Sequence, residues 1–516
     1  MTPRIKSKRG KRSKPSPARG SSTRAASPRS YTPLADALSR PHTFADTELA
    51  EGISRHGLRS LFGQILSKKR RQGAEPLNNL LCALLVWPLL NVKSIHCYCV
   101  ELGQILIGNA SVIYDFLGRE DINWRGFSSE LARRVNQQND LGSLSERAFV
   151  VDDTSKPRSG RKVEGTSSYY DHNEGRTRKG HQVLQLGISG EKGFLPVESQ
   201  LIMGQKSAVD KPEHKPFKDH RCSAARDLRR ARNQSKHELF REMLGRALRA
   251  GFAATYVLAD AWFGCKENIQ ACREHGLIGI FQMKRGNLYY QYRGSNYTAS
   301  QLYVKVQRRM RSNNKKARYK TAALVVKMNL ETRDRKPERW VKVQLVFSAP
   351  VRETRPETWV LFLCTDLTMR EERILKIYAL RWSVEVYFKE IKQHLGFLKE
   401  QSGRYQLAYA SVHLAAIRYL LLFEAMVRSG GLNYGEIRDK QTGYLQMLTY
   451  AGLLWHLFRA LIDGALESLV SELGSDTVQK ITAAIDQTVE SFLNDAFQME
   501  PEQVSAQLKA EKLGYL

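Results

Sequence analysis

The sequence predicts an α/β protein in which a mixed β-sheet core carries a β-rich insertion and is flanked by helical N- and C-terminal regions. Three observations lead to this prediction. Short apolar runs typical of strands, with a helical pattern between them, recur from Ala148 to Met283. Residues 286–368 then contain strand-like runs separated by charged turns. Apolar residues at helical spacing dominate the segments before and after these two regions.

The elements of the core and its insertion follow from the same patterns. In the core we expect strands at Ala148–Val151, Gln182–Ile188 and Leu195–Ile202, a helix at Lys236–Ala250, and buried strands at Thr255–Ala259 and Leu277–Met283. In the insertion we expect strands at Thr321–Lys327, Trp340–Phe347 and Trp359–Cys364. The first core strand is followed directly by Asp152, and the strand at 255–259 by Asp260. An aspartate therefore lies at the end of each of two apolar runs.

The chain is strongly basic, with 81 Lys and Arg against 52 Asp and Glu and a net charge of +29. Such a charge favours a polyanionic partner, and nucleic acid is the leading candidate. The most apolar stretches, Leu80–Leu90 and Leu414–Phe423, fall short of the roughly 20 residues of a membrane-spanning helix, so we expect buried core helices and no membrane association. The seven cysteines form no regular framework, which suits a reducing cytosol, and zinc-finger spacing is absent.

The N-terminal part combines a basic tail with a helical segment. Ten cations and no acidic residue occur within residues 1–30, with Ser, Pro and Gly between them, which predicts disorder. Leu58, Leu61 and Ile65 then follow a helical period, and a basic cluster at Lys68–Arg71 comes next. This cluster is consistent with recognition of a DNA end or with a solvated helix terminus.

One predicted helix carries four polar side chains of complementary chemistry. These side chains have the spacing Y-x2-R-x3-E-x6-K, which places them on one stripe of a helix: Tyr378, Arg381, Glu385 and Lys392. An adjacent apolar stripe provides a face for docking: Ile377, Leu380, Val384, Phe388 and Ile391. A carboxylate among phosphate-binding cations is what a metal-dependent phosphodiester site requires.

Three carboxylates are therefore candidates for one cluster. If the helix packs across the same sheet, Glu385 comes near Asp152 and Asp260. Three clustered anions repel each other, so the cluster is stable at neutral pH mainly with divalent cations bound. Oxygen ligands favour Mg²⁺ or Mn²⁺ over Zn²⁺, and two ions about 4 Å apart would serve an in-line displacement at phosphorus.

Each feature also has a plain structural explanation. An Asp after a strand commonly caps a turn or a helix, and Arg381 and Glu385, four residues apart, suit a surface ion pair. The combination nevertheless favours the metal site, because capping does not predict a second such Asp, a basic chain and a polar stripe beside a docking stripe.

The motifs resemble those of the IS-four family of bacterial insertion-sequence transposases, which belong to the DDE class and have an RNase H-like core. The Y-x2-R-x3-E-x6-K run, with Trp382 after the Arg, resembles the family signature. Val150–Thr154 resembles the motif of the first catalytic Asp, and Leu258–Gly264 that of the second. The resemblance covers roughly residues 145–400, and the insertion at 286–368 lies where the family places one.

The resemblance implies roles for the residues singled out above. It assigns catalysis and the binding of two Mg²⁺ ions, with Mn²⁺ as a substitute, to three carboxylates: Asp152, Asp260 and Glu385. It assigns phosphate contacts near the transposon end to the rest of the stripe: Tyr378, Arg381 and Lys392. The neighbouring Asp153 remains an alternative to Asp152, because only one of two successive strand residues faces the site.

The resemblance further implies a transposase that cuts element ends and transfers them into target DNA, by cut-and-paste through a hairpin intermediate. Its partners would be double-stranded DNA and a second copy in a paired-end complex, in the bacterial cytoplasm and associated with the nucleoid. The domains that we expect are a basic tail at 1–44, a helical DNA-binding domain at 45–140, an RNase H-like catalytic domain at 141–400 and a helical region at 401–516. The alternatives are a domesticated DNA-binding protein and a non-transposing RNase H-like nuclease.

Two further features allow more than one interpretation. The densest basic run outside the tail, residues 308–320, suits a loop that follows phosphates or an exposed charged hairpin. Family members that cut through a hairpin hold a flipped base with an aromatic residue, for which Trp262 and Trp340 are both candidates.

Overall fold

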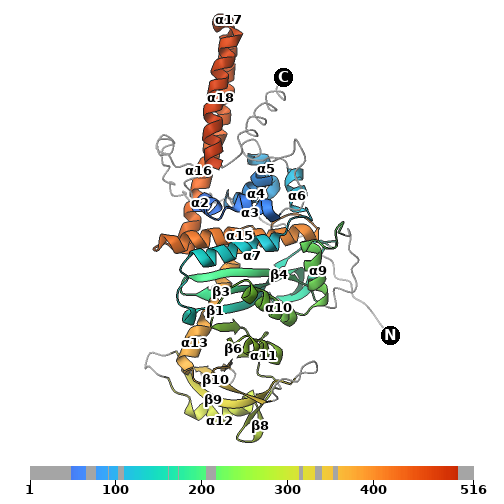
Figure 1. The fold of residues 1–516 in the computed structure, drawn as a ribbon, viewed down its shortest axis with the longest axis vertical. Coiled ribbons are helices and arrows are strands. Elements are labelled where there is room, and N and C mark those ends of the chain that lie inside the picture. Colours follow the sequence, from blue (N-terminus) through green and yellow to red (C-terminus); the bar gives the residue numbers. More distant parts are fainter. Residues whose placement is uncertain are drawn as a thin grey trace, which may run out of the picture. The chain divides into compact units, whose positions relative to one another are not determined.

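The structure is a computed structural model of the 516-residue chain. It describes residues 48–65, 77–90, 92–102, 110–160, 162–171, 174–204, 217–286, 288–312, 318–331, 340–352 and 358–497, all of which belong to one compact unit. The predicted tail at 1–44, the cluster at Lys68–Arg71 and residues 313–317 of the basic run lie outside the described residues. The described part is a mixed α/β fold with one large sheet and flanking helices, which confirms the predicted fold class (Figure 1).

The sheet has 11 strands in the order β2-β3-β1-β5-β6-β11-β10-β9-β7-β8, with β4 also paired to β3. The strands of the core are β1 (Ala148–Pro157), β2 (Ser167–Asp171), β3 (Arg176–Gly190), β4 (Gly193–Ile202), β5 (Tyr256–Ala259) and β6 (Ile278–Met283). Strand β1 pairs antiparallel with β3 and parallel with β5, and β5 pairs parallel with β6. This mixed pairing agrees with the predicted RNase H-like core.

The insertion continues the same sheet. Its strands are β7 (Tyr289–Tyr292), β8 (Ser295–Thr298), β9 (Tyr319–Asn329), β10 (Trp340–Pro350) and β11 (Val360–Cys364). Strand β11 pairs antiparallel with β6, so the insertion adds to the edge of the core sheet. The β7–β8 hairpin was not among the predicted strands. Its two turn residues, Arg293 and Gly294, both have positive φ, as a tight two-residue hairpin turn requires.

Helices precede, connect and follow the strands. Before the sheet lie α2 (Glu48–Arg55), α3 (Leu58–Ile65), α4 (Leu77–Val86), η2 (Trp87–Leu90), α5 (Ile95–Leu102), α6 (Ala110–Leu117), α7 (Trp124–Gln138) and η3 (Leu144–Glu146). Within it lie α9 (Ser223–Asn233), α10 (Lys236–Arg249), α11 (Lys266–Glu274), α12 (Ala299–Val306) and η4 (Gln307–Arg309). After it come α13 (Glu371–Ala379), α14 (Trp382–Gln393), α15 (Tyr405–Ser429), α16 (Tyr434–Ser468), α17 (Val470–Leu473) and α18 (Ser475–Phe497).

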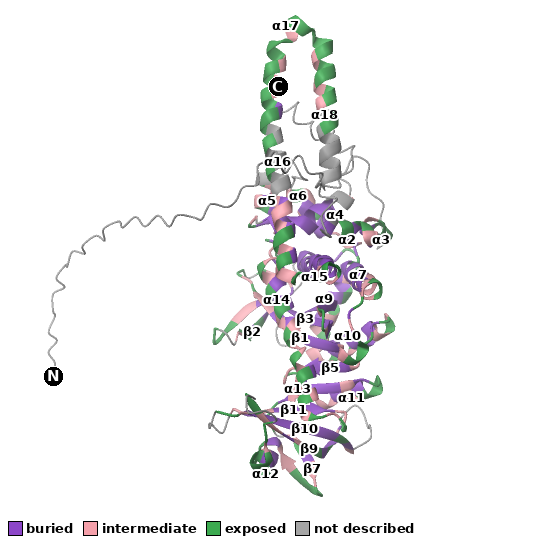
Figure 2. Ribbon diagram, turned by 90° about the vertical axis from the view of Figure 1, so that its left-hand side faces the viewer, coloured by how far each residue is buried: buried purple, intermediate pink, exposed green. Residues whose placement is uncertain are grey.

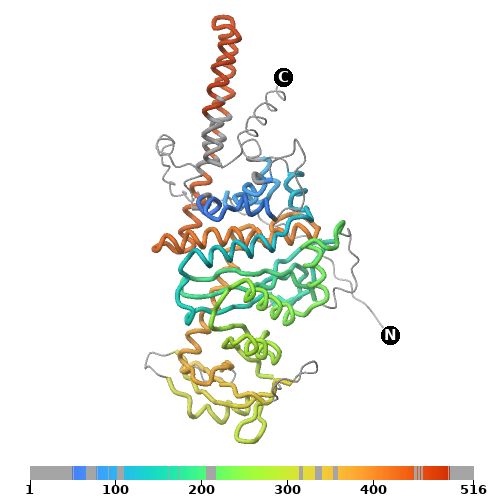
Figure 3. The backbone as a smooth tube through the Cα atoms, in the orientation of Figure 1, coloured from blue at the N-terminus to red at the C-terminus, as the bar shows by residue number. Residues whose placement is uncertain are grey.

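Helices from both ends of the sequence pack around the core sheet. Helix α10 packs on β3 and β4, and α14 packs on β1, β3 and β4; Figure 2 places α10 and α14 on opposite faces. The chain trace shows the N-terminal helices beside α15, although these segments are about 300 residues apart in sequence (Figure 3). Long-range packing therefore joins the two helical regions.

Helix α15 is the central core helix. Every residue from Tyr405 to Ala425 is buried, because α2, α4, α6, α7, α14 and β4 surround the helix. By length and composition α15 is apolar enough to cross a membrane, but 89% of its most apolar window is buried inside the fold. A helix that is apolar all round is expected in the centre of a large core. The predicted burial of Leu414–Phe423, and of most of Leu80–Leu90, is thus confirmed.

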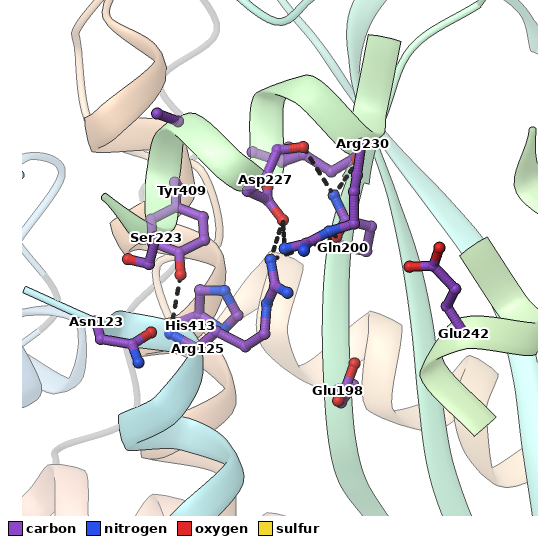
Figure 4. Close-up of polar contacts among 12 residues, drawn as sticks. Asn123, Arg125, Glu198, Gln200, Ser223, Asp227, Arg230, Glu242, Tyr409 and His413 are labelled. Atoms are coloured by element: carbon purple, nitrogen blue, oxygen red, sulfur yellow. Dashed lines mark hydrogen bonds and ion pairs between the residues drawn. The ribbon is translucent and has the colours of Figure 1, made fainter. Parts of the chain in front are cut away.

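A buried polar network ties α7, α9 and α15 to β4 (Figure 4). The Asp227 carboxylate is fully buried. It accepts a hydrogen bond of 2.6 Å from Arg125 Nη2 and one of 2.7 Å from Tyr405 Oη. Gln200 Nε2 donates to the backbone carbonyl of Asp227 over 3.3 Å. Because a buried charge is tolerated only with such partners, this network makes the packing of the helices specific.

We expect Asp227→Ala to lower the free energy of unfolding by about 3 to 5 kcal/mol, because Arg125 would remain buried without its carboxylate. Glu242→Ala is the matched control: Glu242 also pairs with an arginine, Arg246, at 3.2 Å, but it is exposed, so the loss should stay below about 1 kcal/mol. Guanidinium unfolding of both variants, followed by fluorescence, measures the difference. Equal midpoints would contradict the assignment.

Candidate active site

The register between β1 and β5 brings two aspartates together. The parallel pairing ends with Val151 opposite Ala259, so Asp152 and Asp260 are the next residue on each strand. Asp260 follows β5, as predicted. The prediction that Asp152 ends its strand is wrong: β1 continues to Pro157 because the longer β3 still pairs with it. Asp152 is thus the first residue of β1 beyond the partner β5.

The two carboxylates interact electrostatically. The pKa of the Asp152 carboxyl is raised to about 7 because the group is largely buried and the negative charge of Asp260 lies close, while Arg381 acts in the opposite direction. The backbone N–H of Asp153 donates to Asp152 Oδ1 over 2.8 Å, and that of Trp262 to Asp260 Oδ1 over 2.9 Å. The pair therefore occupies a position where positive charge is favourable.

The polar stripe is not on one continuous helix. The structure has two helices, α13 and α14, joined at Leu380 and Arg381, which corrects the prediction of a single helix. At the junction Arg381 N–H bonds to the Tyr378 carbonyl three residues back, as in a tighter 3₁₀ turn. The Leu380 carbonyl is meanwhile taken by two serine hydroxyls, Ser189 at 2.7 Å and Ser383 at 2.9 Å. Side chains that compete for a backbone carbonyl commonly interrupt a helix in this way.

Arg381 connects two of the predicted metal ligands. Its Nη1 donates to Asp152 Oδ2 over 2.8 Å, and its Nη2 donates to Glu385 Oε1 over 2.5 Å. Both contacts are partly shielded from solvent, since the Arg381 and Asp152 side chains are 17% and 16% exposed. One guanidinium thereby joins carboxylates from β1 and α14, which are far apart in sequence.

The charges of the residues present suit a divalent cation, but their side chains do not form a complete set of ligands around one ion. Among the described residues, no three His, Cys, Asp or Glu side chains lie close enough together to hold one ion. Between Asp152 and Glu385 lies the cationic group of Arg381. The pKa of Asp152 is raised chiefly by burial and then by the charge of Asp260, and a bound cation would offset both effects. The three carboxylates therefore stay predicted ligands.

The other two predicted phosphate contacts have different surroundings. Tyr378 Oη lies 3.3 Å from both the Ala259 carbonyl oxygen and Gln282 Oε1, either of which can accept its single proton, and burial raises the pKa of the Tyr378 phenol. Tyr378 thus packs at the end of β5, beside Asp260. Lys392 lies in the last turn of α14, where burial and the charge of Lys156 lower the pKa of its ammonium group. Their phosphate-binding roles remain predictions.

The structure distinguishes Asp153 from Asp152. Asp153 Oδ2 accepts a hydrogen bond of 2.9 Å from Lys236 Nζ, whereas Asp152 contacts Arg381 and interacts with Asp260. Strand alternation explains why the two side chains find different partners. This geometry favours Asp152 as the member of the cluster.

An exposed tryptophan adjoins the aspartates. Trp262 is 51% exposed, and the ammonium groups of Lys284 and Lys236 lie 4.3 and 5.4 Å from the centre of its ring. Sequence reasoning missed both lysines, because neither belongs to a motif and only the turn after β5 brings them to the ring. The other candidate, Trp340, begins β10 in the insertion and is half-buried.

A cavity of about 400 Å³ lies in another part of the fold. It is lined by residues of α5, α6 and the start of α15, among them His96, Tyr114 and Arg404.

A comparison with protein families identifies the chain. The model of a family described as DDE superfamily endonuclease matches residues 101–359. The chain belongs to this family. No curated protein matches the chain. The match contains Asp152 and Asp260, the two aspartates that the sheet brings together, and it ends before α14 and Glu385.

The family establishes the general chemistry of this DDE endonuclease. It is an enzyme of the nuclease type, its substrate is DNA, and enzymes of this class generally use divalent metal ions. The predicted DDE class is therefore confirmed. The matched residues begin in α5 and end just before β11, the last strand of the insertion, so they include the core strands β1 to β6.

We expect Asp152→Asn to weaken Mn²⁺ binding by about tenfold or more, because the change removes one member of the carboxylate pair. Asp153→Asn is the matched control, since its carboxylate pairs with Lys236 instead, and it should keep the wild-type affinity. Isothermal titration with Mn²⁺ measures both. Equal weakening by the two variants would place the ion elsewhere.

Proposed function

We propose that this DDE endonuclease is a transposase of the insertion-sequence type, resembling the IS-four family, which cuts element ends and joins them to target DNA. The observation that carries the proposal is the bridge from Asp152 through Arg381 to Glu385, beside Asp260. It unites both aspartate motifs with the Y-x2-R-x3-E-x6-K signature in one place. A nuclease of another fold would not require these three segments to meet.

Asp152, Asp260 and Glu385 are the residues that would hold two Mg²⁺ ions, or Mn²⁺ in their place. Bound there, the ions would activate the attacking oxygen and neutralise the charge that develops at phosphorus. Arg381 is placed to neutralise the carboxylates and then to exchange these contacts for phosphate oxygens, because guanidinium binds both in the same bidentate geometry. Its present contacts are thus compatible with the phosphate-binding role.

A cut-and-paste route through a DNA hairpin is part of the proposal. A tight hairpin tip is already unstacked, so an exposed aromatic ring beside the site can hold the displaced base at low cost. Trp262 has the required exposure, lies two residues after Asp260 and is flanked by two ammonium groups. These features favour Trp262 over the half-buried Trp340.

We expect Glu385→Gln to retain DNA binding but to lower the rate of Mg²⁺-dependent cleavage by about 100-fold or more, because the amide keeps a hydrogen bond to Arg381 without the charge that a cation needs. The assay is nicking of a supercoiled plasmid that carries the DNA flanking the gene, with binding measured separately by gel shift.

Glu372→Gln, an exposed change on α13, is the control and should cleave at the wild-type rate. Cleavage by Glu385→Gln at the wild-type rate would contradict the assignment of Glu385 to the site. A wild-type protein that binds this DNA but never cuts it would indicate a domesticated DNA-binding protein. Cutting without joining would indicate a non-transposing nuclease.

A second copy of the chain is the proposed partner of the C-terminal helical hairpin, formed by α16, α17 and α18. The hairpin extends away from the sheet and is largely exposed (Figures 1 and 2). Its helix α16 carries apolar side chains that are 36% to 64% exposed and follow the i, i+4, i+7, i+8, i+11 spacing of one helix face: Tyr450, Leu454, Leu457, Phe458 and Leu461. An apolar stripe of this length on an exposed helix typically contacts another protein.

The charge of the hairpin indicates which kind of protein the apolar stripe contacts. Residues 434–497, which form the hairpin, contain four Lys or Arg against nine Asp or Glu, whereas the whole chain carries +29. The acidic hairpin is repelled by DNA and attracted by a basic protein surface, and a second copy of this chain supplies one. A dimer also suits the pairing of two element ends.

We expect the double change Leu457→Lys and Leu461→Lys to convert a dimer into a monomer, because two charges would have to be buried in the contact. Glu467→Lys, at an exposed polar position of the same helix, is the control and should remain dimeric. Light scattering coupled to size exclusion gives the molar mass. An unchanged mass for the double variant would exclude this surface.

A further inference from the structure

A cluster of four cationic side chains lies farther along β1 and α14 than the carboxylates of Asp152 and Glu385. This cationic cluster consists of Lys156 on β1, Arg158 just after β1, Lys392 at the end of α14 and Lys399 in the following turn. All four side chains are partly buried. Lys156 is close enough to both Lys392 and Lys399 to lower the pKa of each ammonium group, in addition to the larger effect of burial. Partly buried cations that repel each other require a compensating anion.

Arg158 is held in place by the surrounding structure. Its Nε donates to His181 Nδ1 over 3.2 Å, and its Nη1 donates to the Glu400 carbonyl over 3.3 Å. His181 is 1% exposed, and burial together with the charge of Arg158 lowers its pKa to about 4, so the ring is neutral. His181 Nε2 in turn donates to the Glu164 carbonyl over 2.9 Å. The guanidinium is therefore pre-positioned, which reduces the entropic cost of binding a ligand.

The anions near the cationic cluster do not balance it. Asp153 and Asp171 act on Lys392, and the buried Glu400 acts on Arg158. Asp153 already pairs with Lys236 at 2.9 Å, and burial raises the pKa of the Glu400 carboxyl.

Within the described part of the chain, neither Lys156 nor Lys392 forms an ion pair, whereas many surface cations do. The uncompensated charge of the cationic cluster thus points to a ligand from outside the chain.

The position of the cationic cluster indicates the chemistry of that ligand. Lys156 is four strand residues after Asp152, about 13 Å, and Lys392 is seven helical residues after Glu385, about 10 Å. Successive phosphates of one DNA strand advance about 3.4 Å along the duplex axis. A strand that crosses the carboxylates would therefore present a phosphate to the cluster roughly three or four nucleotides away.

We propose that the cationic cluster binds a backbone phosphate of the DNA strand, three or four nucleotides from the phosphodiester that is cut. The inference rests on the proposed function in taking Asp152 and Glu385 as the place of cutting. It adds three residues to the single cluster member that the Y-x2-R-x3-E-x6-K signature contains: Lys156, Arg158 and Lys399. The cluster would fix the register of the strand, because the pre-positioned guanidinium of Arg158 and the neighbouring ammonium groups would contact the same part of the backbone.

The first experiment maps lysine acetylation on the wild-type protein with and without a 40-base-pair duplex, using mass spectrometry. We expect the duplex to protect Lys156, Lys392 and Lys399 by about fivefold or more, because a bound phosphate covers their ammonium groups. Lys480 is the internal control: it is exposed on α18, in the acidic hairpin that DNA repels, and should be acetylated equally in both samples. Unchanged acetylation of the cluster lysines, with protection elsewhere, would overturn the inference.

The second experiment measures the salt dependence of binding to the same duplex. Lys156→Ala and Lys392→Ala should each lower the slope of log affinity against log salt by about 0.9, the value of one phosphate contact, and Lys480→Ala should not change it. Slopes equal to that of the wild type would overturn the inference.

Plasmid nicking by the wild-type protein separates the two proposals. If the wild type nicks in Mg²⁺ and the slopes are unchanged, only the cationic cluster is wrongly assigned. If it neither binds nor nicks DNA, the proposed function fails and the inference with it.

Discussion

The parallel pairing of β1 with β5 is the constraint on which the arrangement of the candidate site depends. Because Val151 lies opposite Ala259, the next residue on each strand is an aspartate, and both carboxylates leave the pairing at the same edge. Their proximity is unfavourable in itself, as the raised pKa of Asp152 indicates. Arg381 offsets part of this repulsion and in doing so draws α14 to the pair. The fold therefore holds two negative charges close together, and their repulsion is only partly compensated.

Packing in the core determines where α14 can lie. Tyr387, on the buried side of α14, contacts Tyr419 of α15 edge to face with ring centres 4.7 Å apart, and contacts Phe194 of β4 at 5.1 Å. The hydroxyl oxygens of Ser189 and Ser383 lie 2.7 Å apart at the start of the helix. Because these contacts anchor one side of α14, Glu385 and Lys392 are left on the side of β1. The central helix α15 thus helps to position the candidate site, although it contributes no side chain to it.

The sequence was informative where a local pattern was sufficient. Most strands of the core and of the insertion lie close to the predicted ranges, because alternation and apolar runs report directly on burial, but β2 and the β7–β8 hairpin were not predicted. The start of α10 follows from its capping box, in which Ser235 and Glu238 satisfy each other's backbone N–H groups. Errors arose where a distant partner decided the outcome: β1 continues past Asp152 because β3 extends there, and the helix breaks at Arg381 because Ser189 takes a carbonyl.

By itself the sequence determined the class of fold, the basic character of the chain, the identity of the three candidate carboxylates and the polar stripe that contains one of them. Only the tertiary structure decided that Arg381 bridges two of these carboxylates, that Asp153 pairs with Lys236, and that Lys156 and Lys399 join Lys392. The physical reason is the range of the forces involved. Hydrogen-bonding periodicity and burial leave a signal within about ten neighbouring residues, whereas charges that meet across a sheet leave none until the chain is folded.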